Sequence, residues 1–141
     1  MLLNAVIASI LMVVTCGVHG SGMLLVMAAV RRYEQQQKKN PLRRTHIYWI
    51  GGTVLLMFLV SLVEVMIWAG TYLALAALEG FEQALYFSMV TFTTLGYGEI
   101  VLGEEWRLLA SFEAANGIIM FGWTTAIVIA VVQRVYFGAK D

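Results

Sequence analysis

Charged residues are scarce in this chain, and their scarcity decides its class. Only 13% of the 141 residues are charged, 60% are hydrophobic, and the mean hydropathy is +0.79. A composition of this kind excludes an ordinary soluble domain and indicates an integral membrane protein. Nine basic and nine acidic side chains balance to a net charge of zero. The overall charge therefore gives no sign of a nucleic-acid partner, and we expect none.

Cysteine, histidine and repeated arginine are also rare. The single cysteine, Cys16, lies inside an apolar run, which excludes a disulfide framework and favours a packing role. We find no His/Cys spacing typical of a metal site and no pair of nucleophile and base, so we expect neither an enzyme nor a cofactor. No apolar segment carries an arginine repeat, which argues against a voltage sensor. A large ligand-binding module is not found either.

Three apolar stretches are long enough to span a bilayer, at residues 2–30, 47–78 and 106–137. At about 1.5 Å rise per residue, each helix can cross a hydrocarbon core of about 30 Å. Between the first two lies a polar segment, and the positive-inside rule places it in the cytoplasm. An anchor at anionic headgroups suffices to explain it, although a lipid or regulatory site stays open. Six of the nine basic residues lie there: Arg31, Arg32, Lys38, Lys39, Arg43 and Arg44.

A shorter apolar stretch, residues 81–93, leads directly into a glycine-containing segment, residues 93–98. The stretch is too short to span, which predicts a half-helix that re-enters the membrane where protein surrounds it. Backbone carbonyls can replace the water around a cation only if successive C=O groups turn the same way, which requires alternating left-handed residues. Gly96 and Gly98 tolerate positive φ, and Thr94 can add a hydroxyl. This segment therefore predicts a strand suited to a dehydrated cation.

The segment Thr94-Leu95-Gly96-Tyr97-Gly98 resembles the signature of the potassium-channel superfamily, Thr-Val/Ile/Leu-Gly-Tyr/Phe-Gly. The similarity covers roughly residues 47–137, about two thirds of the chain. It also includes Ala84-Leu85-Tyr86-Phe87, Thr91-Phe92-Thr93-Thr94, Gly117 and Phe121-Gly122.

The resemblance implies an all-α membrane protein with a pore unit like those of bacterial two-transmembrane or two-pore-domain channels. Residues 47–137 would supply an outer helix, a pore helix, a selectivity-filter strand and an inner helix. Residues 1–30 would be an additional transmembrane helix on the outside of that unit, 31–46 a basic cytoplasmic linker and 138–141 a cytoplasmic tail. Asn40 followed by Pro41 predicts a helix start.

The same resemblance implies a potassium-selective channel through which K⁺ passes passively. One strand supplies a quarter of each oxygen ring, so we expect a homotetramer in contact with membrane lipid, and no cofactor beyond the permeant ion. A non-conducting regulatory or accessory subunit stays open as the alternative. The expected K⁺ ligands are the carbonyls of Thr94, Leu95, Gly96 and Tyr97 with the Thr94 hydroxyl, Gly98 completes the filter, and its expected supports are Tyr86, Thr93 and Glu99.

Three residues depart from the family pattern. Glu99 follows the filter where an Asp is usual, and Tyr86 stands where a tryptophan often braces that acid. The Tyr86 hydroxyl can still donate a hydrogen bond to Glu99. Val90 occupies a position at which some bacterial members carry a bracing Glu. These departures leave the rigidity of the filter open, and with it slow inactivation.

The last apolar stretch corresponds to the inner, pore-lining helix. Gly117 matches the glycine at which inner helices of the family bend. One face of the helix carries residues at i, i+3, i+7 and i+11, and we expect it to line the cavity and gate. Ordinary helix packing is the alternative interpretation. The face consists of Ile118, Phe121, Thr125 and Ile129.

Two acidic residues, Glu64 and Glu113, lie inside spanning segments, where an isolated charge is costly. We expect Glu113 to point toward the outer helix and the back of the pore helix. The two acids could meet each other or bond to Asn116, Trp68 or Trp123. Proton sensing and a structural role are both open. The predicted topology is a multi-pass protein of the bacterial inner (plasma) membrane with its N-terminus outside and its C-terminus in the cytoplasm.

Overall fold

The computed structural model describes residues 1–39 and 46–137, which form four helices. They are α1 (Leu2–Lys39), α2 (His46–Ala74), α3 (Phe81–Phe92) and α4 (Arg107–Phe137). These described residues contain no strand. Three stretches, Leu2–Gln36, Tyr48–Ala74 and Arg107–Val135, are long and apolar enough to cross a membrane. The predicted number of spanning-length helices and the short helix between the last two are confirmed.

Two helix boundaries differ from the prediction. α1 continues to Lys39, so the first part of the predicted linker 31–46 is helical, because residues 31–39 are mostly good helix formers without glycine or proline. α2 ends at Ala74, four residues before the predicted end at residue 78. The predicted helix start at Asn40 and the tail 138–141 lie outside the described residues.

The end of α2 is a Schellman motif built without glycine. Ala76 has a φ of 50°, in the left-handed region. The Ala77 N–H donates to the Tyr72 carbonyl at 2.9 Å, and the Ala76 N–H donates to the Leu73 carbonyl at 3.0 Å. These two bonds satisfy carbonyls that the helix end would otherwise leave free. No glycine marks the end of α2, which is why the end predicted from the sequence, at residue 78, comes after the observed one.

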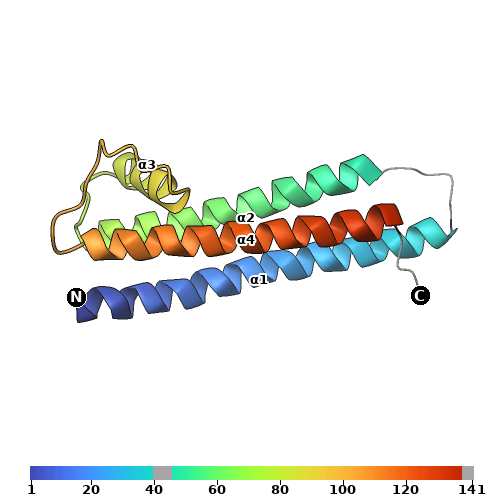
Figure 1. The fold of residues 1–141 in the computed structure, drawn as a ribbon, viewed down its shortest axis with the longest axis horizontal. Helices are drawn as coiled ribbons and strands as arrows, with labels where there is room; N and C mark the ends of the chain where they lie inside the picture. The colour runs from blue at the N-terminus through green and yellow to red at the C-terminus, as the bar shows by residue number, and fades with distance from the viewer. Residues whose placement is uncertain (40–45, 138–141) are drawn as a thin grey trace.

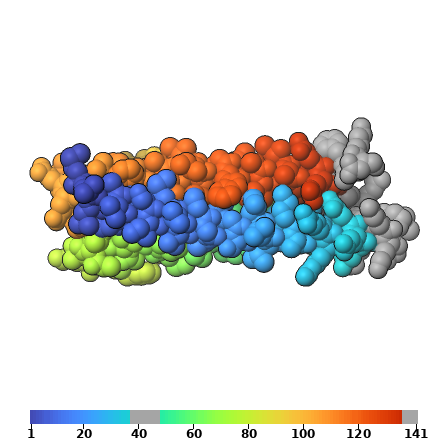
Figure 2. All heavy atoms as spheres, turned by 90° about the horizontal axis from the view of Figure 1, so that it is seen from below, coloured from blue at the N-terminus to red at the C-terminus, as the bar shows by residue number. Residues whose placement is uncertain are grey.

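The three long helices run alongside one another, and α3 is tucked against one end of the bundle (Figure 1). The N-terminus, α3 and the start of α4 lie at that end. The C-terminal end of α1, the start of α2 and the end of α4 lie at the other. Figure 2 shows α1 lying along the seam between α2 and α4. α3 packs on α2 and α4, and the described part of the chain shows no close backbone approach between α3 and α1.

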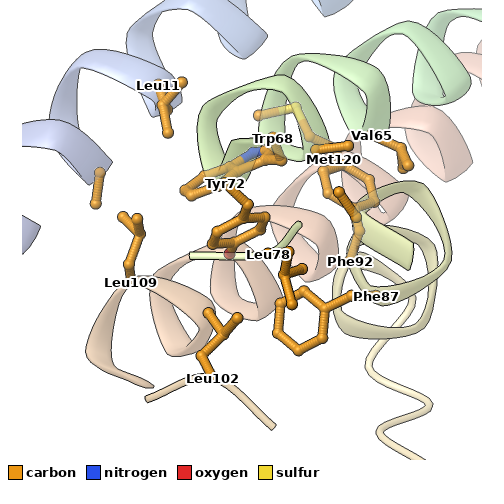
Figure 3. Close-up of a cluster of buried hydrophobic side chains, with 13 residues drawn as sticks. Leu11, Val65, Trp68, Tyr72, Leu78, Phe87, Phe92, Leu102, Leu109 and Met120 are labelled. Carbon is orange, nitrogen blue, oxygen red and sulfur yellow. The ribbon is translucent and has the colours of Figure 1, made fainter. Parts of the chain in front are cut away.

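Two clusters of buried side chains hold the bundle together. The larger one lies at the α3 end and takes residues from all four helices, among them Leu11, Trp68, Phe87 and Met120 (Figure 3). The smaller one joins α1, α2 and α4 toward the other end and includes Met57. α1 therefore shares both cores with the segments that follow it and is an integral part of the bundle.

Candidate functional site

α3 ends against α2 and α4, partway along the bundle, where a cluster of backbone hydrogen bonds reverses the chain. Thr93 caps the helix with a φ of −78°. The Thr94 N–H donates to the Thr91 carbonyl at 2.9 Å. The N–H groups of Leu95 and Gly96 both donate to the Val90 carbonyl, at 3.0 and 3.2 Å. Carbonyls that a helix end leaves free are thus used to fix the start of the following segment.

The backbone of residues 94–98 alternates in handedness. Thr94, Gly96 and Gly98 have φ values of 60°, 57° and 80°, whereas the residues between them do not have positive φ. The expectation that both glycines adopt positive φ is confirmed. Positive φ at Thr94 was not predicted, and for a residue with a Cβ it costs about 1–2 kcal/mol. Strain of this size at one end of an ordered segment points to function.

The segment is also held at its far end. The Tyr86 hydroxyl on α3 donates to Oε2 of Glu99 at 2.9 Å, which is the bond predicted for this pair. This hydrogen bond raises the pKa of the Tyr86 hydroxyl, so its donating form is favoured. Thr93 bonds only within its own helix, with its hydroxyl donating to the Met89 carbonyl at 2.7 Å. Residues 94–98 are thereby fixed at both ends and exposed along their length, with Tyr97 64% exposed.

Glu113 on α4 joins three helices behind this segment. Its carboxyl group is fully buried and accepts hydrogen bonds from the Tyr72 hydroxyl on α2, at 2.6 Å, and from the Ser88 hydroxyl on α3. The Ser88 oxygen also lies 2.9 Å from the Val65 carbonyl oxygen on α2. The prediction that Glu113 points toward the outer helix and the back of the short helix is confirmed. Ser88 and Tyr72 were missed as its partners.

Glu64 has a different partner from those expected. Its Oε1 lies 3.0 Å from Nδ1 of His19 on α1, and both side chains are 0% exposed. The expectation that Glu64 and Glu113 meet each other, or bond to Trp68 or Trp123, is wrong. The reason is that α1 fills the space between α2 and α4 at this level and brings its own polar groups.

Asn116 likewise bonds to α1, not to either acid. Its Nδ2 donates to the Thr15 hydroxyl at 2.9 Å. The sequence signal for these contacts was the set of polar residues in the apolar first segment, which included Thr15 and His19. Their spacing alone does not reveal which helix they face.

Gly117 is a point of close approach between α4 and the end of α3. A Cβ placed on it would overlap the carbonyl oxygen of Phe92 and lie 2.8 Å from the carbonyl carbon. Phe92 is the last residue of α3, so this contact sets the depth of the segment that follows. Gly117 lies ten residues into α4, about 15 Å along its axis. The role predicted for Gly117 as a bend is not tested.

The face of α4 predicted to line a cavity is exposed in the protomer. Ile118 is 61% exposed, and Phe121, Thr125 and Ile129 are exposed as well. Met120, about 100° around the helix from Phe121, is 0% exposed. Packing within this chain therefore does not explain the stripe, which leaves its pore-lining role as the prediction to test.

The chain places a short helix and an alternating backbone segment between two helices of spanning length, an arrangement suited to a segment that re-enters the membrane from one side. Comparison with protein families agrees with this arrangement. A family model described as Ion channel matches residues 60–134, which include the second half of α2, all of α3, the following segment and α4 as far as Arg134. The chain belongs to this ion-channel family, that of two-transmembrane pore domains like those of K⁺ channels.

The chain is thus a multi-pass membrane protein of a transport class. α1 lies before the matched residues and is the extra N-terminal helix that the sequence predicts. No curated protein and no solved structure matched the chain.

Proposed function

We propose that this protein is a potassium-selective channel that conducts K⁺ passively through four copies of residues 94–98. The observation that carries the proposal is the alternating left-handed backbone at Thr94, Gly96 and Gly98, directly after a short helix that ends partway along the bundle. This pattern turns successive carbonyls toward one side, as rings of oxygen ligands require. A regulatory subunit that does not conduct would have no use for the strain at Thr94.

Each residue of the segment has a separate role in the proposal. The carbonyls of Thr94, Leu95, Gly96 and Tyr97 replace the water around K⁺, and the Thr94 hydroxyl adds the innermost ligand. Gly98 supplies the last left-handed position. α3 runs from one end of the bundle toward its middle, so in the proposed tetramer the carbonyls at its C-terminal end place partial negative charge near mid-membrane and favour a cation there.

Four chains are required because one chain carries one such segment. Cyclic symmetry closes four protomers around an axis without leaving an edge. Support for the assembly comes from the exposure of residues 94–98 and of the Ile118, Phe121, Thr125 and Ile129 stripe, which the protomer leaves uncovered. In the tetramer these surfaces surround the ion path, and the outer faces of α1 and α2 meet lipid.

The proposed orientation has the N-terminus and the α3 end outside and the C-terminus in the cytoplasm of a bacterial inner membrane. It is supported by the arrangement of the bundle, since the N-terminus and α3 share one end (Figure 1). The basic residues at the end of α1 lie at the opposite end, where the positive-inside rule predicts the cytoplasm.

Glycine substitutions test the filter assignment. We expect Gly96→Ala and Gly98→Ala to abolish the preference for K⁺ over Na⁺ in liposome flux while the protein still inserts, because a Cβ is strained at their positive φ. Gly103→Ala is the matched control. Gly103 lies shortly after the segment, and a Cβ there meets nothing within 4 Å at a φ that alanine tolerates. Preserved K⁺ preference in either filter variant would refute the assignment.

A further inference from the structure

His19 lies near the middle of α1, is 0% exposed, and contacts both other spanning helices. Its Nδ1 is 3.0 Å from Oε1 of Glu64 on α2, and its Nε2 is 3.2 Å from the hydroxyl oxygen of Thr124 on α4. One imidazole ring therefore bridges α2 and α4 through its two nitrogens. This bridge is independent of the bonds that Glu113 makes at the α3 end.

The helices around the bridge approach one another closely. The indole ring of Trp123 on α4 lies 5.2 Å from the His19 ring, centroid to centroid, with an angle of 30° between the planes. A Cβ on Gly20 would lie 3.9 Å from that indole. A Cβ on Gly22 would lie 2.6 Å from a methyl carbon of Val60 on α2, closer than real Cβ atoms approach. The small residues of α1 thus allow His19 to reach both neighbours.

The chemistry of the bridge favours histidine at this position. A neutral imidazole has one N–H donor and one acceptor nitrogen, so the ring can pair with the Glu64 carboxyl group through Nδ1 and with the Thr124 hydroxyl through Nε2 at the same time. The groups that face the ring from α4 are Thr124 and Trp123, which do not titrate in the physiological range. The rigid ring holds these two nitrogens on opposite sides, which suits a contact to a different helix from each.

The contact on α4 lies next to the stripe proposed to face the cavity. Thr124 directly precedes Thr125, and it lies seven residues beyond Gly117, about 10 Å further along the axis. Gly117 and Glu113 fix α4 against α3 and α2 near the filter segment. His19 contacts α4 further from the filter segment, beside the exposed stripe. Thr124 is thus the point at which α1 contacts α4 directly beside the stripe.

We propose that His19 is a positioning residue for conduction: through it α1 holds α4 against α2 and sets the open–closed equilibrium of the pore. α1 is then a built-in regulator of the inner helix as well as an additional membrane anchor. This inference rests on the proposed channel function.

Recordings from single channels in bilayers test the proposal with two variants. His19→Phe removes both contacts. Thr124→Val keeps the shape of the side chain, removes only the hydroxyl, and leaves the buried His19 and Glu64 pair intact, so it remains informative if His19→Phe fails to assemble. We expect the open–closed equilibrium to change about fivefold in Thr124→Val, which is the effect of one lost hydrogen bond, and at least as much in His19→Phe, which loses both. The unitary conductance and the K⁺ over Na⁺ preference should stay as in the wild type.

Two controls separate positioning from a general loss of stability. Thr124→Ser keeps the hydroxyl, and Ser21→Ala removes an exposed hydroxyl on α1 that bonds only to the carbonyl of Gly17 in its own helix. Both should gate as the wild type does. The double variant His19→Phe with Thr124→Val should change the equilibrium no more than the larger single change, because the two act through one contact. An unchanged equilibrium in Thr124→Val, or multiplied effects in the double variant, would overturn the proposal.

A second measurement does not depend on conduction. Met120→Cys in a Cys16→Ala background places a single thiol on the buried side of α4, and its modification rate is read by mass spectrometry in purified protein. Adding Thr124→Val should raise this rate about fivefold. An unchanged rate would overturn the positioning role even in a conducting channel. A raised rate in a protein that carries no K⁺ would support the role of His19 and refute the proposed function alone.

Discussion

Gly117→Ala tests whether the close contact between α4 and the end of α3 at Phe92 stabilises the protein. The added methyl group would overlap the Phe92 carbonyl oxygen, and backbone on both sides leaves no flexible side chain that could give way. Overpacking typically costs about 1–3 kcal/mol, and a backbone neighbour places this site at the upper end. Alanine in place of glycine also stabilises a helix interior by about 1 kcal/mol. We therefore expect a net loss of about 2 kcal/mol.

The assay is thermal melting of the detergent-solubilised assembly, followed by size-exclusion chromatography. A loss of about 2 kcal/mol corresponds to a fall in Tm of roughly 6 °C for a chain of this size. Gly70→Ala is the control, because Gly70 lies inside α2 and a Cβ there meets nothing within 4 Å. Its Tm should stay the same or rise. If Gly117→Ala melts like Gly70→Ala and alters only gating, Gly117 acts as a bend and the close-approach account is refuted.

Three further predictions concern the filter brace, the stripe and the buried acid. We expect Tyr86→Phe to inactivate faster than the wild type at neutral pH, and equal inactivation there would contradict the brace. The bond to Glu99 raises the pKa of the Tyr86 hydroxyl from 10.0, so the wild type keeps this brace below pH 10 and loses it as the pH rises through the raised value. Recordings at high pH should therefore show the two proteins converging. Phe121→Cys should react with small cationic thiol reagents from the cytoplasmic side and block current, whereas Met120→Cys should be protected; equal reactivity would mean that the stripe is wrongly assigned. If ionisation of Glu113 biases the gate, current should depend less on pH in Glu113→Gln, and an unchanged pH dependence would leave only its structural role.

The sequence was most informative where one chemical requirement restricts the residue type. Positive φ at alternate positions requires glycine or a strained residue, so Gly96 and Gly98 could be placed before the structure was known. The hydrogen bond between Tyr86 and Glu99 was also predictable, because the family pattern fixes the spacing between the short helix and the filter.

The contacts of α1 could not be predicted, since packing decides them. A helix that is apolar on all sides gives no sign of which face is buried, and His19 therefore had no assigned partner. Once α1 lies in the seam between α2 and α4, its rotation follows from small residues such as Gly22 and from the pairing of His19 with Glu64. The late predicted end of α2 has a similar cause, because Ala76 adopts the left-handed conformation that the sequence would assign to glycine.

Flux through the purified wild-type protein in liposomes tests the central claim most directly. Vesicles loaded with K⁺ and diluted into Na⁺ should develop a K⁺ diffusion potential, and the same vesicles loaded with Na⁺ and diluted into K⁺ should show the opposite sign. Empty vesicles and the Gly96→Ala protein, which has lost a left-handed filter position, are the controls. The account predicts a potential close to that of a K⁺-selective membrane. Equal permeability to Na⁺ and K⁺, or no flux from an assembled tetramer, would contradict it.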